Sequence, residues 1–563
     1  MAGNPSPTAA LQYEVRRGSY YDSVILMQLQ RGLVGLPSVQ DAGVVMATPA
    51  NKDLLKESDL LPESVQAGSD DLLIVVRADH DGAARDAIAQ VDSLLARKRT
   101  AVDQAFTPKS LDSAARLAPE SDWVLISVPG RYAAHVARQA LDLGRHVFLY
   151  SDNVAIEDEI ALKKRAQSSG RLVMGPDCGT AIVHGVGLGF ANRVRRGDVG
   201  AVAASGTGLQ AVASRVHGLG GGISQAFGTG SHDLSAEVGG ITTLQALSYL
   251  AQDAATRVIV LLSKPPHPEV AGRVLAAARS TGKPVVVYFL GHPPPARRLG
   301  NLHFASSLSE AASLALDAPD AAEPRPATAR PPGARARFVR GLFSGGTLAT
   351  EALQALQVLL HPLYSNVPLR ESQRLTDPLH SQAHTLLDLG ADQFTVGRLH
   401  PMIDNDLRLR RLRQEAEDSE AGVILLDLVL GMGAHPDPAS ELAPALAEVR
   451  LRRPDLAVGV LLVGTDEDPQ DLDRQRRLLS EAGSEVFTTT SELAEFAAAR
   501  VSSPAEAPPT LARLDPPLRA INVGLQAFFE SLQAQGAEAI HVDWRPPAGG
   551  DEALMAILAR MGA

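Results

Sequence analysis

Short apolar runs alternate with amphipathic stretches along almost the whole chain. In the stretches, apolar residues recur every three to four positions, which is typical of a helix with one buried face. Near the N-terminus the apolar runs that indicate strands are residues 43–47, 72–77, 123–128, 146–150 and 172–174. Helical periodicity covers residues 84–97, 133–143 and 156–168. Because strands and helices alternate, the predicted fold class is α/β, with doubly wound parallel sheets covered by helices on both faces.

One strand–turn–helix pattern occurs twice. Residues 200–204 form an apolar run that leads into Ser205, Gly206, Thr207 and Gly208, and residues 338–342 lead through Ser344 into Gly345, Gly346 and Thr347. Each copy continues into a Gly-containing loop and another apolar strand, residues 258–262 and 423–426. A helix that begins at such a turn offers unpaired backbone N–H groups and the positive end of its dipole. Two such turns predict an anion held from two sides; the competing interpretation is a pair of ordinary tight turns.

Composition divides the chain into five segments. Residues 317–337 and 503–517 are rich in Pro and poor in large apolar residues, which is typical of linkers. The predicted boundaries are 1–175, 176–316, 317–337, 338–500 and 501–563. Further strands are expected at residues 284–290, 457–463 and 485–488, and the tail should hold a strand at 520–524 and a helix at 525–535. That tail is short, so we expect it to dock on the preceding domain.

Bulk properties restrict the partners and the compartment. A chain of 563 residues is too long for one core. Its net charge of −11 argues against nucleic acid as a partner, because binding to phosphates needs a basic face. The lone Cys178 excludes an intrachain disulfide and fits a reducing compartment. Residues 1–10 do not resemble a signal peptide, and no apolar run reaches the ~18 residues that span a bilayer. We therefore expect a cytoplasmic protein that binds no membrane.

Several polar side chains follow the two repeated motifs closely. The candidate catalytic groups are His232, Lys264, Arg398 and His400. The loops that would support them contain Gly228, Gly230, Asp388 and Gly390. Imidazole, ammonium and guanidinium groups suit an anionic substrate, although a buried structural His or a solvated Lys is the competing interpretation. No metal-ligand spacing, Walker-type loop or Gly-x-Ser-x-Gly elbow is present, so no metal site is predicted.

Parts of the chain resemble succinyl-CoA synthetase. The turn at Thr48, Pro49 and Lys52 is similar to the CoA-binding turn of its α subunit, and Ser127, Val128 and Pro129 are similar to a strand end of the same subunit. Residues 175–179 and 205–207 also resemble α-subunit turns, whereas residues 345–346 and 388–390 resemble the carboxyl domain of the β subunit. This resemblance implies a Rossmann-like CoA-binding-type domain at 1–175, two flavodoxin-like ligase-type domains at 176–316 and 338–500, and a possible CoA-like pocket.

The resemblance has two departures. In the synthetases the two helix starts flank a phosphohistidine that lies in a Gly-His-Ala-Gly-Ala turn. Here residues 298–305 replace that turn and His303 is displaced, so we do not expect His303 to be phosphorylated. The second departure is the ATP-grasp domain, which needs roughly 150–200 residues that the chain does not have to spare.

The FdrA-type proteins resemble the chain over essentially its whole length. The matching segments are residues 21–24, 48–52, 150–154, 174–180, 204–208, 237–240, 263–266, 395–398, 400–404 and 520–524. This resemblance implies a subunit of an oxamate carbamoyltransferase complex in allantoin and purine catabolism. Such a complex would convert oxamate and carbamoyl phosphate reversibly into oxalurate and phosphate, within a hetero- or homo-oligomer. Two alternatives stay open: an acyl-CoA synthetase or acyl transferase that works with a separate ATP-grasp protein, and a non-catalytic scaffold.

Overall fold

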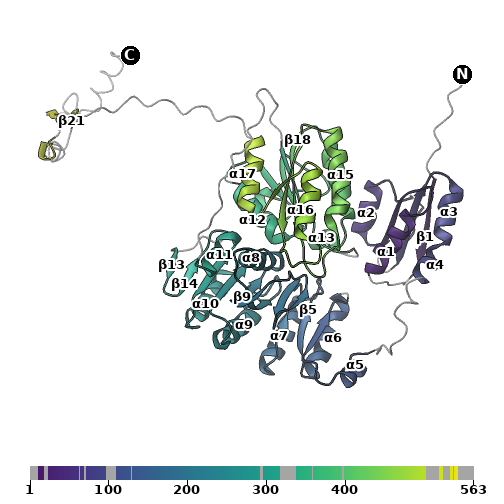
Figure 1. Ribbon diagram of the computed structural model, residues 1–563, viewed down its shortest axis with the longest axis horizontal. Coiled ribbons are helices and arrows are strands. Elements are labelled where there is room, and N and C mark those ends of the chain that lie inside the picture. The colour runs from purple at the N-terminus through teal and green to yellow at the C-terminus, as the bar shows by residue number, and fades with distance from the viewer. Residues whose placement is uncertain are drawn as a thin grey trace, which may run out of the picture. The chain divides into compact units, whose positions relative to one another are not determined.

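The computed structural model describes residues 10–17, 23–62, 64–68, 71–96, 110–128, 130–291, 296–317, 338–357, 359–395, 398–501, 519–523, 530, 533–536 and 538–542. The chain forms two compact units, Met1–Ser503 and Pro504–Ala563. The larger unit contains four sheets, and helices flank them (Figure 1).

The N-terminal part of the larger unit is a small α/β domain around an antiparallel sheet. Its strands are β1 (Ala10–Arg16), β2 (Val39–Met46) and β3 (Leu72–Ala78), in the order β1-β3-β2. Helices α1 (Ser23–Val34), α3 (Asp81–Ala89) and α4 (Val91–Ala96) bury one face of this sheet. Helix α2 (Pro49–Glu57) covers the other face.

A second, parallel sheet follows in the chain. It contains β4 (Trp123–Ile126), β5 (His146–Leu149) and β6 (Val173–Met174), with helices α5 (Leu111–Leu117), α6 (Gly130–Asp142) and α7 (Ile156–Ser168). The prediction that residues 1–175 form one Rossmann-like domain is therefore wrong, because they contribute to two separate sheets. Local periodicity reports which residues are buried in a strand but not the direction of that strand, so it could not separate the antiparallel sheet from the parallel one.

The domain that the sequence predicts as the first ligase-type domain is built on an eight-stranded sheet of order β13-β14-β12-β11-β9-β10-β7-β8. Its parallel strands are β9 (Arg196–Ala204), β10 (Ile223–Gly228), β11 (Val258–Ser263), β12 (Val285–Phe289) and β14 (Leu302–Phe304). The edges carry β7 (Thr180–Val183), β8 (Val186–Gly189) and β13 (Arg298–Leu299) in antiparallel pairings. Helices α8 (Gly206–Gly218) and α11 (Leu308–Ala315) cover one face, and α9 (Ile241–Gln252) and α10 (Pro268–Arg279) cover the other.

The second ligase-type domain repeats this plan in a six-stranded parallel sheet of order β16-β17-β15-β18-β19-β20. The strands are β15 (Phe338–Phe343), β16 (Leu363–Ser365), β17 (His384–Asp388), β18 (Ala421–Val429), β19 (Ala457–Val463) and β20 (Glu485–Phe487). The helices are α12 (Gly346–Leu356), α13 (Asp392–Thr395), α14 (Asp406–Glu417), α15 (Pro438–Arg452), α16 (Leu472–Glu481) and α17 (Thr490–Val501). The five parallel strands of the first domain have the flavodoxin-like order 2-1-3-4-5, whereas the six strands of the second have the order 2-3-1-4-5-6. In both domains the strand of the repeated motif, β9 or β15, lies at the switch point of the sheet.

One hydrophobic core joins the two ligase-type domains. Leu209 on α8 and Leu308 on α11 belong to the same buried cluster as Leu348 on α12 and Leu493 on α17. Because both repeated helices contribute to this shared core, packing brings the two strand-to-helix turns together.

The smaller unit contains two parallel strands, β21 (Arg519–Val523) and β22 (Glu538–Val542). Most of the helix expected at 525–535 and almost all of the linker expected at 317–337 lie outside the described residues. Within the described part of the chain, no helix has both the length and the apolar character needed to span a bilayer.

Candidate functional site

The two strand-to-helix turns are in direct contact. The hydroxyl groups of Ser205 and Thr347 are 2.6 Å apart and share a hydrogen bond. Gly345 lies so close to Thr207 that an added methyl group would be 2.8–2.9 Å from its side chain. The structure therefore brings the two predicted helix starts together, although they are far apart in the sequence.

This contact changes how an anion could be held. Side chains of Thr207 and Thr347 fill the space between the two starts, and both residues are buried. An anion must instead be bound by the backbone N–H groups of the first helical turns. Those of Gly206, Thr207, Gly346 and Thr347 have no acceptor among the described residues, whereas Gly208 N–H donates to Ser205 Oγ (3.2 Å). The available donors are thus first-turn amides of both helices, at the positive ends of their dipoles.

The tight fit at Gly345 gives a direct test of the contact. Gly345→Ala should lower the free energy of unfolding by about 1–3 kcal/mol, because the methyl group overpacks against Thr207. Gly206→Ala is the matched control, since its methyl group would meet Thr180 Oγ1 at an ordinary 3.7 Å. Denaturant unfolding of both variants measures the difference. Equal stability of the two variants would contradict the close contact.

An internal carboxylate already binds part of the second turn. Asp427 accepts hydrogen bonds from the backbone N–H of Ser344 (2.7 Å) and Gly345 (2.8 Å), and from Ser344 Oγ (2.9 Å). The guanidinium of Arg408 also donates to Asp427, and both side chains are buried. The amides of Ser344 and Gly345 are therefore satisfied within the protein, as in an ordinary tight turn, and are not free to bind an external anion.

Charged side chains gather beside the helix starts, where strands from several sheets end. Lys264 follows β11, Asp177 lies between β6 and β7, and Asp388 is the last residue of β17. Burial raises the pKa of Asp177 to about 6 and that of Asp388 to about 6, while the nearby Lys264 ammonium opposes both shifts. Asp388 also touches the start of α12, because a methyl group on Gly346 would collide with its Oδ2. Lys264 thus lies within electrostatic range of both carboxyl groups, beside the candidate anion site.

His232 belongs to the same cluster. It lies in the loop between β10 and α9, and its Nδ1 is 3.4 Å from Glu159 Oε2. The Glu159 carboxylate raises the pKa of His232. Gly228 and Gly230 in this loop pass close to residues 175–180: a side chain on Gly228 would strike Cys178 and one on Gly230 would strike Pro176. These two glycines therefore fix the loop that carries His232.

His400 lies beside the corresponding loop of the second domain. Its Nδ1 accepts a hydrogen bond from Met402 N–H (3.2 Å), and its Nε2 would be 2.7 Å from a methyl group on Gly390. Burial lowers the pKa of His400 to about 4, so the ring is neutral at neutral pH. The structure therefore supports His400 as a neutral hydrogen-bonding group and not as a cation.

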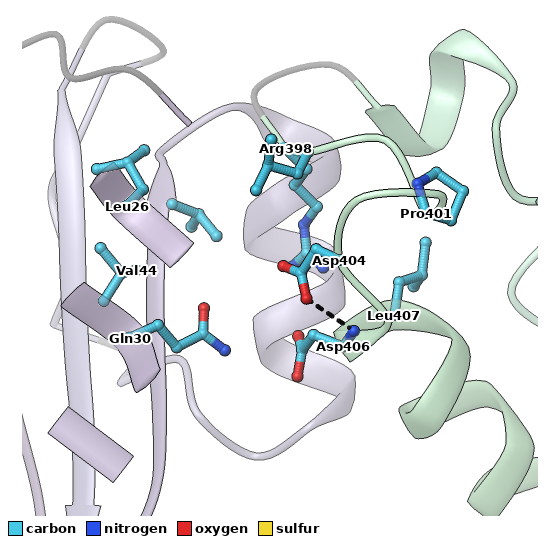
Figure 2. A pocket seen from close by; sticks show the side chains of 10 residues that line it. Leu26, Gln30, Val44, Arg398, Pro401, Asp404, Asp406 and Leu407 are labelled. Atoms are coloured by element: carbon cyan, nitrogen blue, oxygen red, sulfur yellow. Dashed lines mark hydrogen bonds between the residues drawn. The ribbon is translucent and has the colours of Figure 1, made fainter. Parts of the chain in front are cut away.

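Arg398 contacts the N-terminal domain. Its Nε donates to Asn51 Oδ1 at 2.6 Å, and no contact within the described residues joins it to either helix start. Arg398 lines a cavity of about 40 Å³, together with Leu26, Gln30, Val44, Val45, Leu399, Pro401, Asp404, Asp406 and Leu407. Figure 2 shows Arg398 and the two aspartates beside side chains of α1 and β2. We had expected Arg398 at the anion site, and this position gives that role no support.

The residues of the expected CoA-like pocket are divided between two sheets. Thr48, Pro49 and Lys52 belong to the antiparallel N-terminal domain, where Lys52 Nζ donates to the carbonyl oxygen of Ala67 (3.0 Å). Ser127 and Val128 follow β4 in the parallel sheet, and Pro129 lies outside the described residues. No contact within the described ranges joins these two groups. The expected pocket would therefore have to draw on two domains, because β2 and β3 belong to a sheet separate from that of β4.

Sequence reasoning missed several charged residues of the site. Glu159, Lys163 and Asp427 were not candidates, because none belongs to a recognisable motif. The only local signal was the spacing of Glu159 and Lys163 by four residues on a polar helix, which normally indicates a solvated surface pair.

Comparisons with known proteins identify the family. Family models match residues 9–109 (AllF, heavy metal-associated domain), 195–291 (CoA binding domain) and 342–501 (CoA-ligase). The chain is 40% identical to the uncharacterized protein YahF of Escherichia coli K12 over 489 residues, which cover 83% of this chain and 94% of YahF. The chain belongs to the FdrA-like family of YahF. The CoA-binding match covers β9 to β12 of the eight-stranded sheet, whereas the sequence predicts a CoA-binding-type domain at residues 1–175.

Two more distant likenesses accompany this family. The α subunit of an ADP-forming succinate–CoA ligase from Aquifex aeolicus is 28% identical over 185 residues, which cover 31% of this chain and 59% of that subunit. The crystal structure of PH0766 from Pyrococcus horikoshii OT3 is 16% identical, with a TM-score of 0.31, and the match covers 71% of this chain and 87% of that one. The domain composition of this chain, as the family models give it, includes a CoA-binding and a CoA-ligase domain.

The N-terminal domain of this family member does not fit a thiolate-bound heavy metal. Residues 9–109 contain no cysteine, since Cys178 is the single cysteine of the chain. Burial raises the pKa of Cys178 to about 12, so that thiol stays protonated. Soft metals select thiolate ligands, and this domain offers none. Among the described residues, no group of three or more His, Cys, Asp or Glu side chains is arranged to hold a metal ion.

Proposed function

We propose that this protein transfers an acyl group between phosphate and an acceptor thiol, as the acyl-phosphate half of a CoA-ligase-type reaction. A separate ATP-grasp subunit would couple this half-reaction to ATP. The observation that carries the proposal is the pair of abutting helix starts at the switch points of the two sheets. Their first-turn amides have no acceptor among the described residues, and Asp388, which touches the start of α12, is within electrostatic range of Lys264. The CoA-binding and CoA-ligase matches support this class of reaction.

The chemistry follows from where charge develops. The first-turn amides and Lys264 would hold the phosphate group of an acyl phosphate. When the acceptor attacks the acyl carbon, the carbon–oxygen bond to phosphate breaks and negative charge grows on the departing phosphate. Preorganised N–H donors and a positive side chain stabilise that charge without reorganising. The same groups would bind free phosphate in the reverse reaction.

The position of His303 in the hairpin of β13 and β14 favours a preformed acyl phosphate as the substrate over a phosphorylated histidine as an intermediate. His303 lies within β14, where it pairs with Val286 of β12 and with Arg298 of β13. Val286 is near the beginning of β12, away from the carboxyl ends of the strands where Lys264 and Asp388 lie. A histidine held in that ladder is poorly placed to carry a phosphoryl group to the helix starts.

Carbamoyl transfer is the second candidate function. Carbamoyl phosphate is itself a preformed acyl phosphate, and oxamate would replace the thiol of CoA as acceptor. The observation that favours this candidate is the division of Thr48 and Lys52 from Ser127 and Val128 between two sheets, which departs from the single CoA-like domain that the synthetase resemblance implied. In either case we propose that other subunits complete the enzyme.

A product assay distinguishes the two candidates. The full chain, co-expressed with its genomic neighbours, is incubated with acetyl phosphate and CoA, or with carbamoyl phosphate and oxamate. Formation of acetyl-CoA supports the first proposal, and formation of oxalurate supports the second. Lys264→Ala should reduce the productive reaction on the order of 100-fold, because a charge that stabilises the leaving phosphate is lost. Lys164→Ala, at an exposed position of α7, is the matched control. If neither pair of substrates is turned over, both proposals fail and the remaining interpretation is a non-catalytic scaffold.

A further inference from the structure

A fully buried network of three charged side chains lies behind His232. The side chains of Glu159, Lys163 and Asp233 each have an exposed fraction of 0%. Lys163 Nζ donates to Glu159 Oε1 (2.7 Å), to Asp233 Oδ1 (2.8 Å) and to the carbonyl oxygen of Thr229 (2.9 Å). These three bonds use all the hydrogens of the ammonium group.

The network has more negative than positive charge. One ammonium group faces two carboxylates, so the formal charge of the three side chains is −1. Asp233 is further stabilised by the start of α9, because it accepts from the backbone N–H of Thr242 (3.2 Å) and Thr243 (2.9 Å) and from Thr243 Oγ1 (2.7 Å). Glu159 is therefore the carboxylate whose charge is least compensated.

The second oxygen of Glu159 faces His232. Glu159 Oε2 is buried and has no hydrogen-bond partner within the described residues, and its distance to His232 Nδ1 is 3.4 Å. A buried carboxylate oxygen without a hydrogen-bond donor is costly, so this oxygen favours a proton on Nδ1. The side chain of His232 is 60% exposed, so most of the ring faces solvent and not Glu159.

Other charged groups around His232 also favour a positive charge on its ring. Asp177, in the turn between β6 and β7, and Asp392, on α13, both favour the protonated ring. Lys264 is the nearby positive group, and it lies close to Asp177. Ser231, next to His232, donates its hydroxyl to Asp177 Oδ2 and so ties the loop to that turn.

We propose that His232 is the general base of the acyl transfer and that Glu159 is its positioning residue. This inference rests on the proposed function. A neutral ring whose Nδ1 carries the proton, directed at Glu159, presents its lone pair at Nε2. Nε2 removes the proton from the acceptor S–H or N–H group as the new bond to the acyl carbon forms. The bond between that carbon and the phosphate oxygen then breaks, and phosphate leaves with the electron pair.

The buried network makes the proton transfer favourable. When Nε2 takes the proton, the ring becomes a cation and compensates the formal charge of −1 behind it. The reverse reaction returns the proton from Nε2 to the leaving sulfur or nitrogen atom. A carboxylate that orients a histidine and stabilises its cation plays this role in catalytic triads of other folds.

Chemical modification tests the pair without any substrate. The full chain is treated with diethyl pyrocarbonate between pH 5 and 9, and mass spectrometry follows the peptide that contains His232. In the wild type we expect the midpoint of reactivity above the ordinary 6.5, because the Glu159 carboxylate raises the pKa of His232. Glu159→Gln should lower that midpoint. Asp377→Asn removes a carboxylate beside an exposed histidine, His380, and should leave the His232 midpoint unchanged. Identical midpoints in the wild type and Glu159→Gln would overturn the pairing.

Activity then tests the role in catalysis. His232→Asn changes a largely exposed side chain and should reduce transfer about 100- to 1,000-fold. Full turnover of this variant would overturn the general-base assignment and leave the proposed function standing. If the wild type transfers no acyl group from acetyl phosphate or carbamoyl phosphate, the proposed function fails, and the modification midpoints still decide the pairing of His232 with Glu159.

Discussion

Lys163→Met should lower the free energy of unfolding by roughly 3–5 kcal/mol, the largest loss of stability that we expect from a single substitution. Methionine matches the length of the lysine stem but removes the ammonium group that joins Glu159 and Asp233. Two fully buried carboxylates would then face each other without a positive partner, and the carbonyl oxygen of Thr229 would lose its donor. Breaking a buried ion pair is expensive for this reason, even where the intact pair contributes little.

The structure provides a local reporter for this effect. Trp123 lies on β4, in the sheet that α7 helps to cover, and its ring stacks on His146 with centroids 4.8 Å apart. In a Trp544→Phe background Trp123 is the single tryptophan, so its fluorescence follows unfolding of this part of the chain. Lys164→Met is the matched control on the same helix, because Lys164 is exposed, and it should change stability by less than about 0.5 kcal/mol. Equal denaturation midpoints for Lys163→Met and Lys164→Met would show that the network contributes nothing to stability.

The central geometry of the site could be predicted from the repeated motif. Two strands that end in Ser-Gly or Ser-Gly-Gly turns and continue into Ala-rich helices fit only a few arrangements, and the strand order of each sheet puts its turn at a switch point. The contact of Ser205 with Thr347 is then a consequence of packing α8 and α12 into one core. The pattern could not show that no room for an anion is left between the two turns. The side chains of Thr207 and Thr347 fill that space, and this depends on their volume in the folded structure.

Two other features could not be predicted from the sequence, for physical reasons. The charged pair of Glu159 and Lys163 has the spacing of a solvated surface pair, and only the fold shows that α9 and the loop after β10 cover it. The N-terminal domain was misjudged because β1 is only partly buried along its length and has no strong apolar run. Without β1, strands β2 and β3 are easily mistaken for the start of a parallel sheet, and the apparent CoA-binding turn at Thr48 was assigned to the wrong domain.

Binding of an oxyanion at the helix starts should strengthen as the pH falls from 8 to 5. Asp177 and Asp388 lie in the cluster that contains Lys264, and burial raises the pKa of each to about 6. Both groups are mainly negative above that pH and mainly neutral below it, so repulsion of an anion is lost as the pH falls through 6. Protonation of His232, whose pKa is also raised, adds a positive charge as the pH falls and therefore also strengthens binding of the oxyanion. The same carboxyl groups make the folded state less stable as the pH rises from about 4 to about 6, because their ordinary pKa of 3.8 is lower than the folded value.

Sulfate is the appropriate probe, because it remains a dianion over this range whereas phosphate itself titrates. Calorimetry should show an affinity for sulfate that rises on the order of tenfold for each carboxyl group that is neutralised. Asp388→Asn should increase the affinity at pH 8 by a similar factor and should reduce the dependence on pH, since Asp388 touches the start of α12 at Gly346. Asp392 is exposed, and Asp392→Asn should have a smaller effect because solvent screens its charge. An affinity that is constant from pH 5 to 8 in the wild type, or unchanged in Asp388→Asn, would place the anion elsewhere and remove the support for acyl phosphate chemistry at these two helices.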